Sequence, residues 1–198
     1  LATAVFTGRD DGDMAAFVQL EALALQRGDP ADAAWQRARR GQACIALLRH
    51  GEAERLVGEA LAILRGLPPT PVMARVLHVE AWRLMIERDA AASVRAASQA
   101  LALAESAGDA SLVRAIRGGM GIATLFLHYD EAIAQCEARL AEFRAEGRIA
   151  NVVTLLSNLG SGSGELMHLA RAEAWLREAL ALCRTHEFDG QVDYMQAW

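Results

Sequence analysis

The fold is decided by a phrase that the chain repeats, and its clearest copy is HLARAEAWLREAL at residues 168–180. Similar runs rich in Ala and Leu, each with a small or charged start, occupy residues 12–25, 51–64, 88–101 and 128–140. Five equivalent positions lie roughly 37 to 40 residues apart: Ala24, Ile63, Ala100, Arg139 and Ala179. A period of this size is typical of stacked helical units, because one unit cannot bury its apolar face alone.

Composition also favours helices throughout. The 198 residues are 53% hydrophobic, mostly Ala and Leu, which are strong helix formers, and only four are Pro. Gly, Pro and Asp occur at regular breaks, where helices stop and start. We expect a leading helix at 13–27, paired helices at 31–49 with 52–65, 71–87 with 90–107, 110–126 with 130–146 and 149–166 with 169–186, and a last helix from near Val192.

We therefore predict an all-α, right-handed superhelical solenoid of antiparallel helix pairs, with about 4–5 repeats of 37–40 residues. It is expected to form a single repeat domain over residues 1–198 that is a piece of a longer chain, since the first residue is not Met. The interior is predicted to contain Leu47, Leu56, Ala81, Ala97, Ala100, Ala132, Leu159, Ala172, Leu176 and Ala179.

The predicted last turn of the array is apolar. Residues 193–198, with Trp175 and Leu182 of the preceding helix, resemble the opening of a further repeat and not a polar cap. An uncovered apolar end favours association. We therefore expect this stretch of chain to form a homodimer through exposed repeat ends, and we expect a longer chain that covers these ends not to pair through them.

Charge and cysteine content narrow the functional classes. The net charge is −5, and all 20 positive residues are Arg. The acidic balance argues against direct nucleic-acid binding, and the lack of Lys excludes a P-loop or Schiff-base lysine in this chain. No apolar run reaches the ~18 residues of a membrane span, so we expect no membrane partner. Cys44, Cys136 and Cys183 lack CxxC spacing and are predicted to be buried, reduced thiols of a cytoplasmic protein.

No motif predicts catalysis. The glycine-rich stretches at 118–121 and 160–164 follow no expected strand and have no GK[ST], so we expect no phosphate loop. Close helix approach explains Gly160, whereas Gly162 and Gly164 do not need it. The five histidines lack metal spacing, and His50, His128 and His168 fall at expected turns. We predict no enzymatic activity, no cofactor and no metal.

One pair of helices carries a recognisable motif. Asn158-Leu159-Gly160 is followed by Ala172, Leu176 and Ala179. This spacing resembles the tetratricopeptide repeat, in which a Leu-Gly pair precedes a small residue by 12, with further small or apolar residues at +4 and +7. An earlier unit repeats the spacing at Ala81, Ser93, Ala97 and Ala100.

The repeat resemblance extends over nearly the whole chain. The longer period and the sequence at 171–180 also resemble the sensor arrays of MalT-like and large ATP-dependent LuxR-type bacterial transcriptional regulators. In such arrays the first helix of each pair lines a concave groove. The register places Ala38, Arg75, Arg114 and Thr154 at equivalent positions.

The resemblance implies a binding groove made by Arg75, His78, Trp82, Arg114, Arg117, Ser157, Asn158 and Ser161. Arg guanidinium groups suit carboxylates, Trp is an apolar anchor, and an Asn amide at this position often binds a peptide backbone in related arrays. The alternative is structural: the arginines pair with Glu80, Glu87 or Asp109, and Trp82 belongs to the core.

Two functions therefore stay open. The first is a sensing domain of a cytoplasmic bacterial regulator, which binds an acidic protein or peptide, or a small-molecule effector. The second is a scaffold or adaptor for protein assembly with no small-molecule trigger. A nucleotide-binding module before Leu1 and a helix-turn-helix after Trp198 would select the first.

Overall fold

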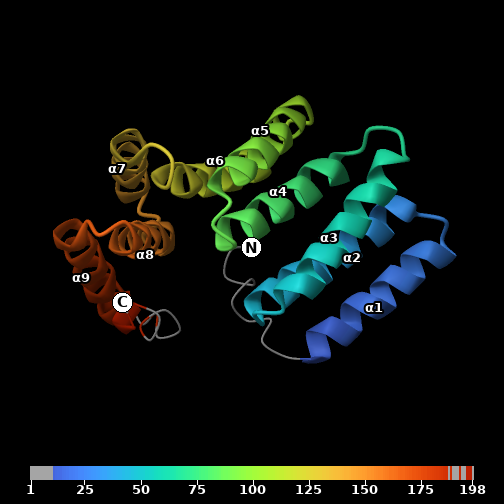
Figure 1. Cartoon of the computed structure of the whole chain (residues 1–198), viewed down its shortest axis with the longest axis horizontal. Helices are drawn as coiled ribbons and strands as arrows, with labels where there is room; N and C mark the ends of the chain where they lie inside the picture. Colours follow the sequence, from blue (N-terminus) through green and yellow to red (C-terminus); the bar gives the residue numbers. More distant parts are fainter. Residues whose placement is uncertain (1–10, 187, 189–191, 193–194, 198) are drawn as a thin grey trace. The chain divides into compact units, whose positions relative to one another are not determined.

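The computed structural model describes residues 11–186, 188, 192 and 195–197 (Figure 1). In this part of the chain all regular structure is helical, as the sequence predicts. The helices are α1 (Asp11–Gln26), α2 (Pro30–Ala46), α3 (His50–Arg65), α4 (Pro71–Ile86), α5 (Ala90–Ser106), α6 (Ala110–Leu125), α7 (Tyr129–Ala145), α8 (Ile149–Glu165) and α9 (Leu169–His186). The helix expected from near Val192 falls largely on residues outside the description.

The helix ends follow from local chemistry. Asp29 and Asp89 stand before α2 and α5, and each side chain accepts a hydrogen bond of 2.9 Å from a backbone N–H of the first turn. Pro30 and Pro71 are the first residues of α2 and α4. Proline has no backbone N–H, and at this position no hydrogen bond is lost because the first N–H groups of a helix have no partner within it. Gly28, at φ +70°, ends the turn after α1 in the left-handed conformation that glycine adopts without strain.

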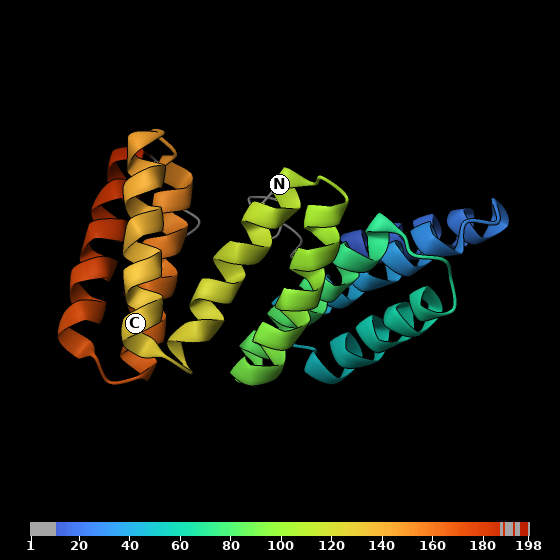
Figure 2. The ribbon, with the colours of Figure 1, turned by 90° about the horizontal axis from the view of Figure 1, so that it is seen from above.

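The helices divide into two compact units, residues 1–119 and 120–198. In the first unit, α2 packs on α3 and α4 packs on α5, while α1 covers α2 and both α2 and α3 touch α4. In the second unit α8 packs on α9 and on α7, and Figure 2 shows these three helices side by side. Packing between consecutive helices is what the repeat predicts. The right-handed superhelix stays a prediction.

Two helix pairs share one close contact across a separation of 12 residues. A Cβ placed on Gly41 would lie 3.3 Å from the carbonyl oxygen of Ala53, and one on Gly160 would lie 3.4 Å from that of Ala172. The α2–α3 and α8–α9 pairs therefore pack in the same register, and glycine permits the close approach in both.

The α4–α5 pair uses the same register with a hydrogen bond. Ser93, 12 residues after Ala81, donates from Oγ to the Ala81 carbonyl oxygen at 2.7 Å. This alignment makes Trp35 the equivalent of Arg75 in the first pair. The expected equivalence of Ala38 is therefore wrong by one helical turn, which explains why Ala38 is fully buried while Arg75 is exposed.

Burial follows the predicted pattern closely. All of the predicted interior residues are buried except Leu47, which is partly exposed because it lies just after the end of α2. The three cysteines are buried, as expected. The prediction that Gly162 needs no close packing is wrong. A Cβ there would lie 3.3 Å from Leu125 Cδ1, so this glycine also permits close packing.

In the described part of the chain, no helix combines the length and apolarity that crossing a membrane requires.

Candidate functional site

The predicted groove residues fall in both units. Arg75, His78 and Trp82 lie on α4 at helical spacing, and Arg114 and Arg117 lie one turn apart on the part of α6 that belongs to the first unit. We call these five residues the α4–α6 face. The remaining predicted residues belong to α8 in the second unit and are described separately: Ser157, Asn158 and Ser161.

Arg75 is held only loosely. Its Nη2 atom lies 3.7 Å from Asp109 Oδ2, and 47% of the Arg75 side chain is exposed. Asp109 has a second task, because its Oδ1 atom accepts a hydrogen bond of 3.0 Å from the backbone N–H of Leu112. A long, exposed ion pair of this kind contributes about 0–1 kcal/mol to stability. The Arg75 guanidinium can therefore exchange this carboxylate for another at little cost.

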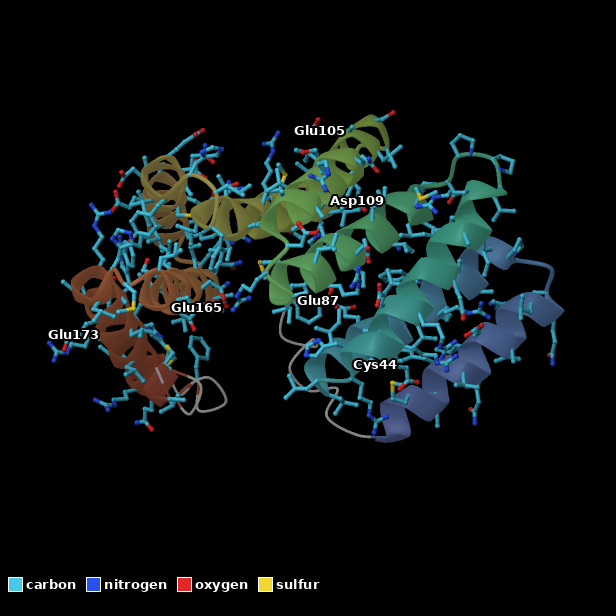
Figure 3. All side chains as sticks on the ribbon, in the orientation of Figure 1. Cys44, Glu87, Glu105, Asp109, Glu165 and Glu173 are labelled. Atoms are coloured by element: carbon cyan, nitrogen blue, oxygen red, sulfur yellow. The ribbon has the colours of Figure 1, made fainter. Side chains whose placement is uncertain are left out.

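The two arginines of α6 differ in their partners. Arg117 Nη2 donates to Glu105 Oε1 at 2.8 Å, and both side chains are about half exposed (Figure 3). Arg114 is exposed, and none of the carboxylates in the described residues pairs with it. Arg114 is thus the cation of this face that is open to an external anion.

His78 and Trp82 face the interior more than the arginines do. Burial lowers the pKa of His78, since desolvation penalises the protonated ring. A Cβ on Gly119 would lie 3.9 Å from His78 Cε1, so α4 and α6 approach each other here. Gly119 lies on the opposite side of α6 from Arg114 and Arg117, so this contact does not bring the two arginines to His78. Trp82 is partly buried and packs against a cluster that includes Cys44 and Leu56. Part of Trp82 therefore serves the core, as the structural alternative predicts.

Glu80 and Glu87 bind Arg83, and not the arginines of the predicted groove. Arg83 is buried, with Nε and Nη2 each donating to Glu80 at 2.8 Å and Nη1 donating to Glu87 at 2.6 Å. These bonds raise the pKa of Arg83 further above its usual range. Glu80 and Glu87 are therefore engaged away from the α4–α6 face. In the sequence, Glu80 lies three residues before Arg83 and Glu87 lies four residues after it, a spacing that favours ion pairs on one helix.

The α8 residues are less accessible than the groove prediction implies. Ser157 and Ser161 are buried, at 6% and 7% exposure, and Ser161 Oγ donates to the Asn158 carbonyl oxygen at 3.3 Å. Asn158 is half buried. Of these three side chains, Asn158 is the most exposed.

A polar cluster at one end of the second unit was not predicted. The Tyr129 hydroxyl lies 3.0 Å from the buried Oγ of Ser163, and the Tyr129 ring stacks on His168 at 3.8 Å. Arg171 lies 5.8 Å from the Tyr129 ring centroid. These contacts join the start of α7 to the end of α8, the α8–α9 turn and the start of α9, and a sequence separation of 34 residues or more conceals them from local pattern analysis.

Within the described residues, no three His, Cys, Asp or Glu side chains gather as a metal site requires. No family model matches the chain, and no curated protein matches it significantly in sequence.

Among solved structures, the chain is similar to the crystal structure of BtubC (BKLC) from P. vanneervenii. The TM-score is 0.60 at 18% sequence identity, over 88% of this chain and 74% of that chain. At this identity the likeness shows the fold alone, which is a helical-repeat fold.

Proposed function

We propose that this chain is a tetratricopeptide-like interaction domain that binds an acidic protein segment through the α4–α6 face. The observation that carries the proposal is Arg114, which is exposed and has no carboxylate partner among the described residues. Arg75 and Arg117 support it, because their own ion pairs are long or exposed and therefore weak.

The finer proposal concerns the protein to which this domain belongs. The resemblance of its repeats to MalT-like and LuxR-type sensor arrays supports a sensing role in a cytoplasmic bacterial transcriptional regulator. There, a bound acidic partner or small-molecule effector changes contacts with other modules. A scaffold without a small-molecule trigger is the second candidate, and the open reading frame around this chain distinguishes the two.

The chemistry of the face gives a direct test. An array of 15-residue peptides with graded acidic and apolar content is screened, and the tightest hits are measured by calorimetry. Arg114→Ala should weaken the acidic hits by roughly 1–3 kcal/mol, the range for losing a charged hydrogen bond. Binding should also fall with added salt.

Arg95→Ala is the matched control. Arg95 is an exposed arginine of α5 that lies outside the α4–α6 face. Arg95→Ala removes the same positive charge as Arg114→Ala, so a long-range effect of charge alone would weaken binding equally in the two variants. Equal affinity of wild type, Arg114→Ala and Arg117→Ala for the acidic peptides would reject the proposed site.

Self-association through exposed repeat ends is also proposed. On α1 the aliphatic residues Val18, Leu20, Leu23 and Leu25 are 40–55% exposed. Val18 and Leu25 lie on one side of α1 and Leu20 and Leu23 on the other, and exposed apolar side chains at the first helix of the array favour pairing. Sedimentation that shows a strict monomer at high concentration would contradict it.

A further inference from the structure

A hollow of about 470 Å³ opens on the first unit between α3, α4 and α5. Its walls are mainly aliphatic, and its lining residues are Leu61, Arg65, Met73, Leu77, Gln99, Ala102 and Leu103. None of them belongs to the α4–α6 face. The volume lies within the ~300–1,000 Å³ that small-molecule sites occupy, although the hollow is open to solvent over much of its extent.

An irregular turn accompanies the hollow. Three residues separate each pair of successive helices from α1 to α9, except that five residues, 66–70, separate α3 from α4. The hollow is lined by the last turns of α3 and the first turns of α4, which this longer turn joins. The hollow therefore lies beside the longest turn between these helices.

The polar side chains that line the hollow are positive or neutral. Arg65 and Gln99 are its polar lining side chains, and no acidic residue lines it. Arg65 is exposed, and no carboxylate of the described residues pairs with it. An aliphatic wall beside one unpaired guanidinium complements a molecule with an apolar body and one negative head.

The start of α4 adds to this complementarity. Thr70 stands at the N-cap position of α4 without a side-chain cap hydrogen bond, and it does not itself line the hollow. Met73, in the first turn of α4, lines the hollow. A helix N-terminus favours a nearby anion. Both the Arg65 guanidinium and the α4 dipole therefore favour a carboxylate at this end.

From these observations we infer that the hollow is a binding site for a medium-chain aliphatic carboxylate. The alkyl chain lies along Leu61, Leu77 and Leu103, and the carboxylate accepts hydrogen bonds from the Arg65 guanidinium. The site is independent of the acidic-segment face and goes beyond the function proposed above.

The test uses decanoate, below its micelle-forming concentration, and its uncharged analogue decanol, below its solubility limit. Calorimetry on the wild-type chain should show decanoate binding about tenfold tighter than decanol, because the guanidinium adds a charged hydrogen bond. Arg65→Gln should reduce decanoate to the affinity of decanol and leave decanol unchanged. Arg95→Gln, which removes an arginine outside the hollow, should preserve the preference.

A second variant tests the location of the alkyl chain. Ala102 is an exposed lining residue, so Ala102→Trp is expected to fold and to fill the hollow. It should weaken both ligands at least fivefold, with helix content checked by circular dichroism. The inference is overturned if neither ligand binds the wild type, if Arg65→Gln keeps the preference for decanoate, or if a folded Ala102→Trp binds both unchanged.

Discussion

Gly41 and Gly58 lie in the same α2–α3 pair and have opposite surroundings. A Cβ on Gly41 would lie 2.6 Å from Val57 Cγ2, whereas one on Gly58 meets nothing within 4 Å. Overpacking costs about 1–3 kcal/mol and exceeds the ~1 kcal/mol that alanine gains over glycine in a helix. Gly41→Ala should therefore lower the free energy of unfolding by about 1–2 kcal/mol, and Gly58→Ala should raise it by up to ~1 kcal/mol. Urea titration measures both, and a Gly41→Ala variant as stable as wild type would refute this packing.

His78 gives a second prediction at the residue scale. Burial lowers its pKa below the 6.5 expected in the unfolded chain. The unfolded chain therefore binds the proton first as the pH falls, and stability is lost below about pH 6.5. The free energy of unfolding of wild type, relative to His78→Gln, should fall between pH 8 and pH 5. Parallel pH profiles for the two proteins would show that His78 does not contribute.

At the scale of one helix, Glu21 anchors α1 to α2. Glu21 is buried at 6% exposure and accepts hydrogen bonds from Arg37 Nε at 2.8 Å and Arg40 Nη1 at 3.0 Å. Glu21→Gln removes the charge that both arginines share and should cost about 1–3 kcal/mol. Amide exchange in residues 14–26 should quicken, and Glu54→Gln, an exposed change on α3, should leave it unaltered. Unchanged exchange in α1 would mean that apolar contacts suffice to hold it.

At the scale of the whole molecule, the cysteines report on each unit. Cys44 belongs to the first unit and Cys136 to the second, and both are buried. Burial raises the pKa of Cys136 to about 11 and also raises that of Cys44, so neither should react with a thiol reagent until its surroundings open. In variants that keep one cysteine, Gly160→Ala should speed labelling of Cys136 and leave Cys44 unchanged, because repeats couple mainly to neighbours. Equal acceleration at both sites would indicate one cooperative unit.

The sequence by itself determined the helices and most of the interior. Within the described residues, the bounds of the nine helices fall within three residues of those expected, because Asp, Gly and Pro control helix ends through local backbone chemistry. Ala97, Ala132 and Leu159 could be placed inside from periodicity alone, because every repeat presents the same face to its neighbour. These properties depend on residues close together in the chain.

Only the tertiary structure decided which charged and polar groups are available for binding. Arg75 and Arg114 share a register position, yet Arg75 has Asp109 beside it and Arg114 has no carboxylate partner among the described residues. Ser157 and Ser161 were expected at a groove and are buried instead. The hollow beside Arg65 depends on how α3, α4 and α5 are spaced in three dimensions. A side chain's partners come from other helices, and the repeat period fixes which face a residue occupies without fixing what lies opposite it.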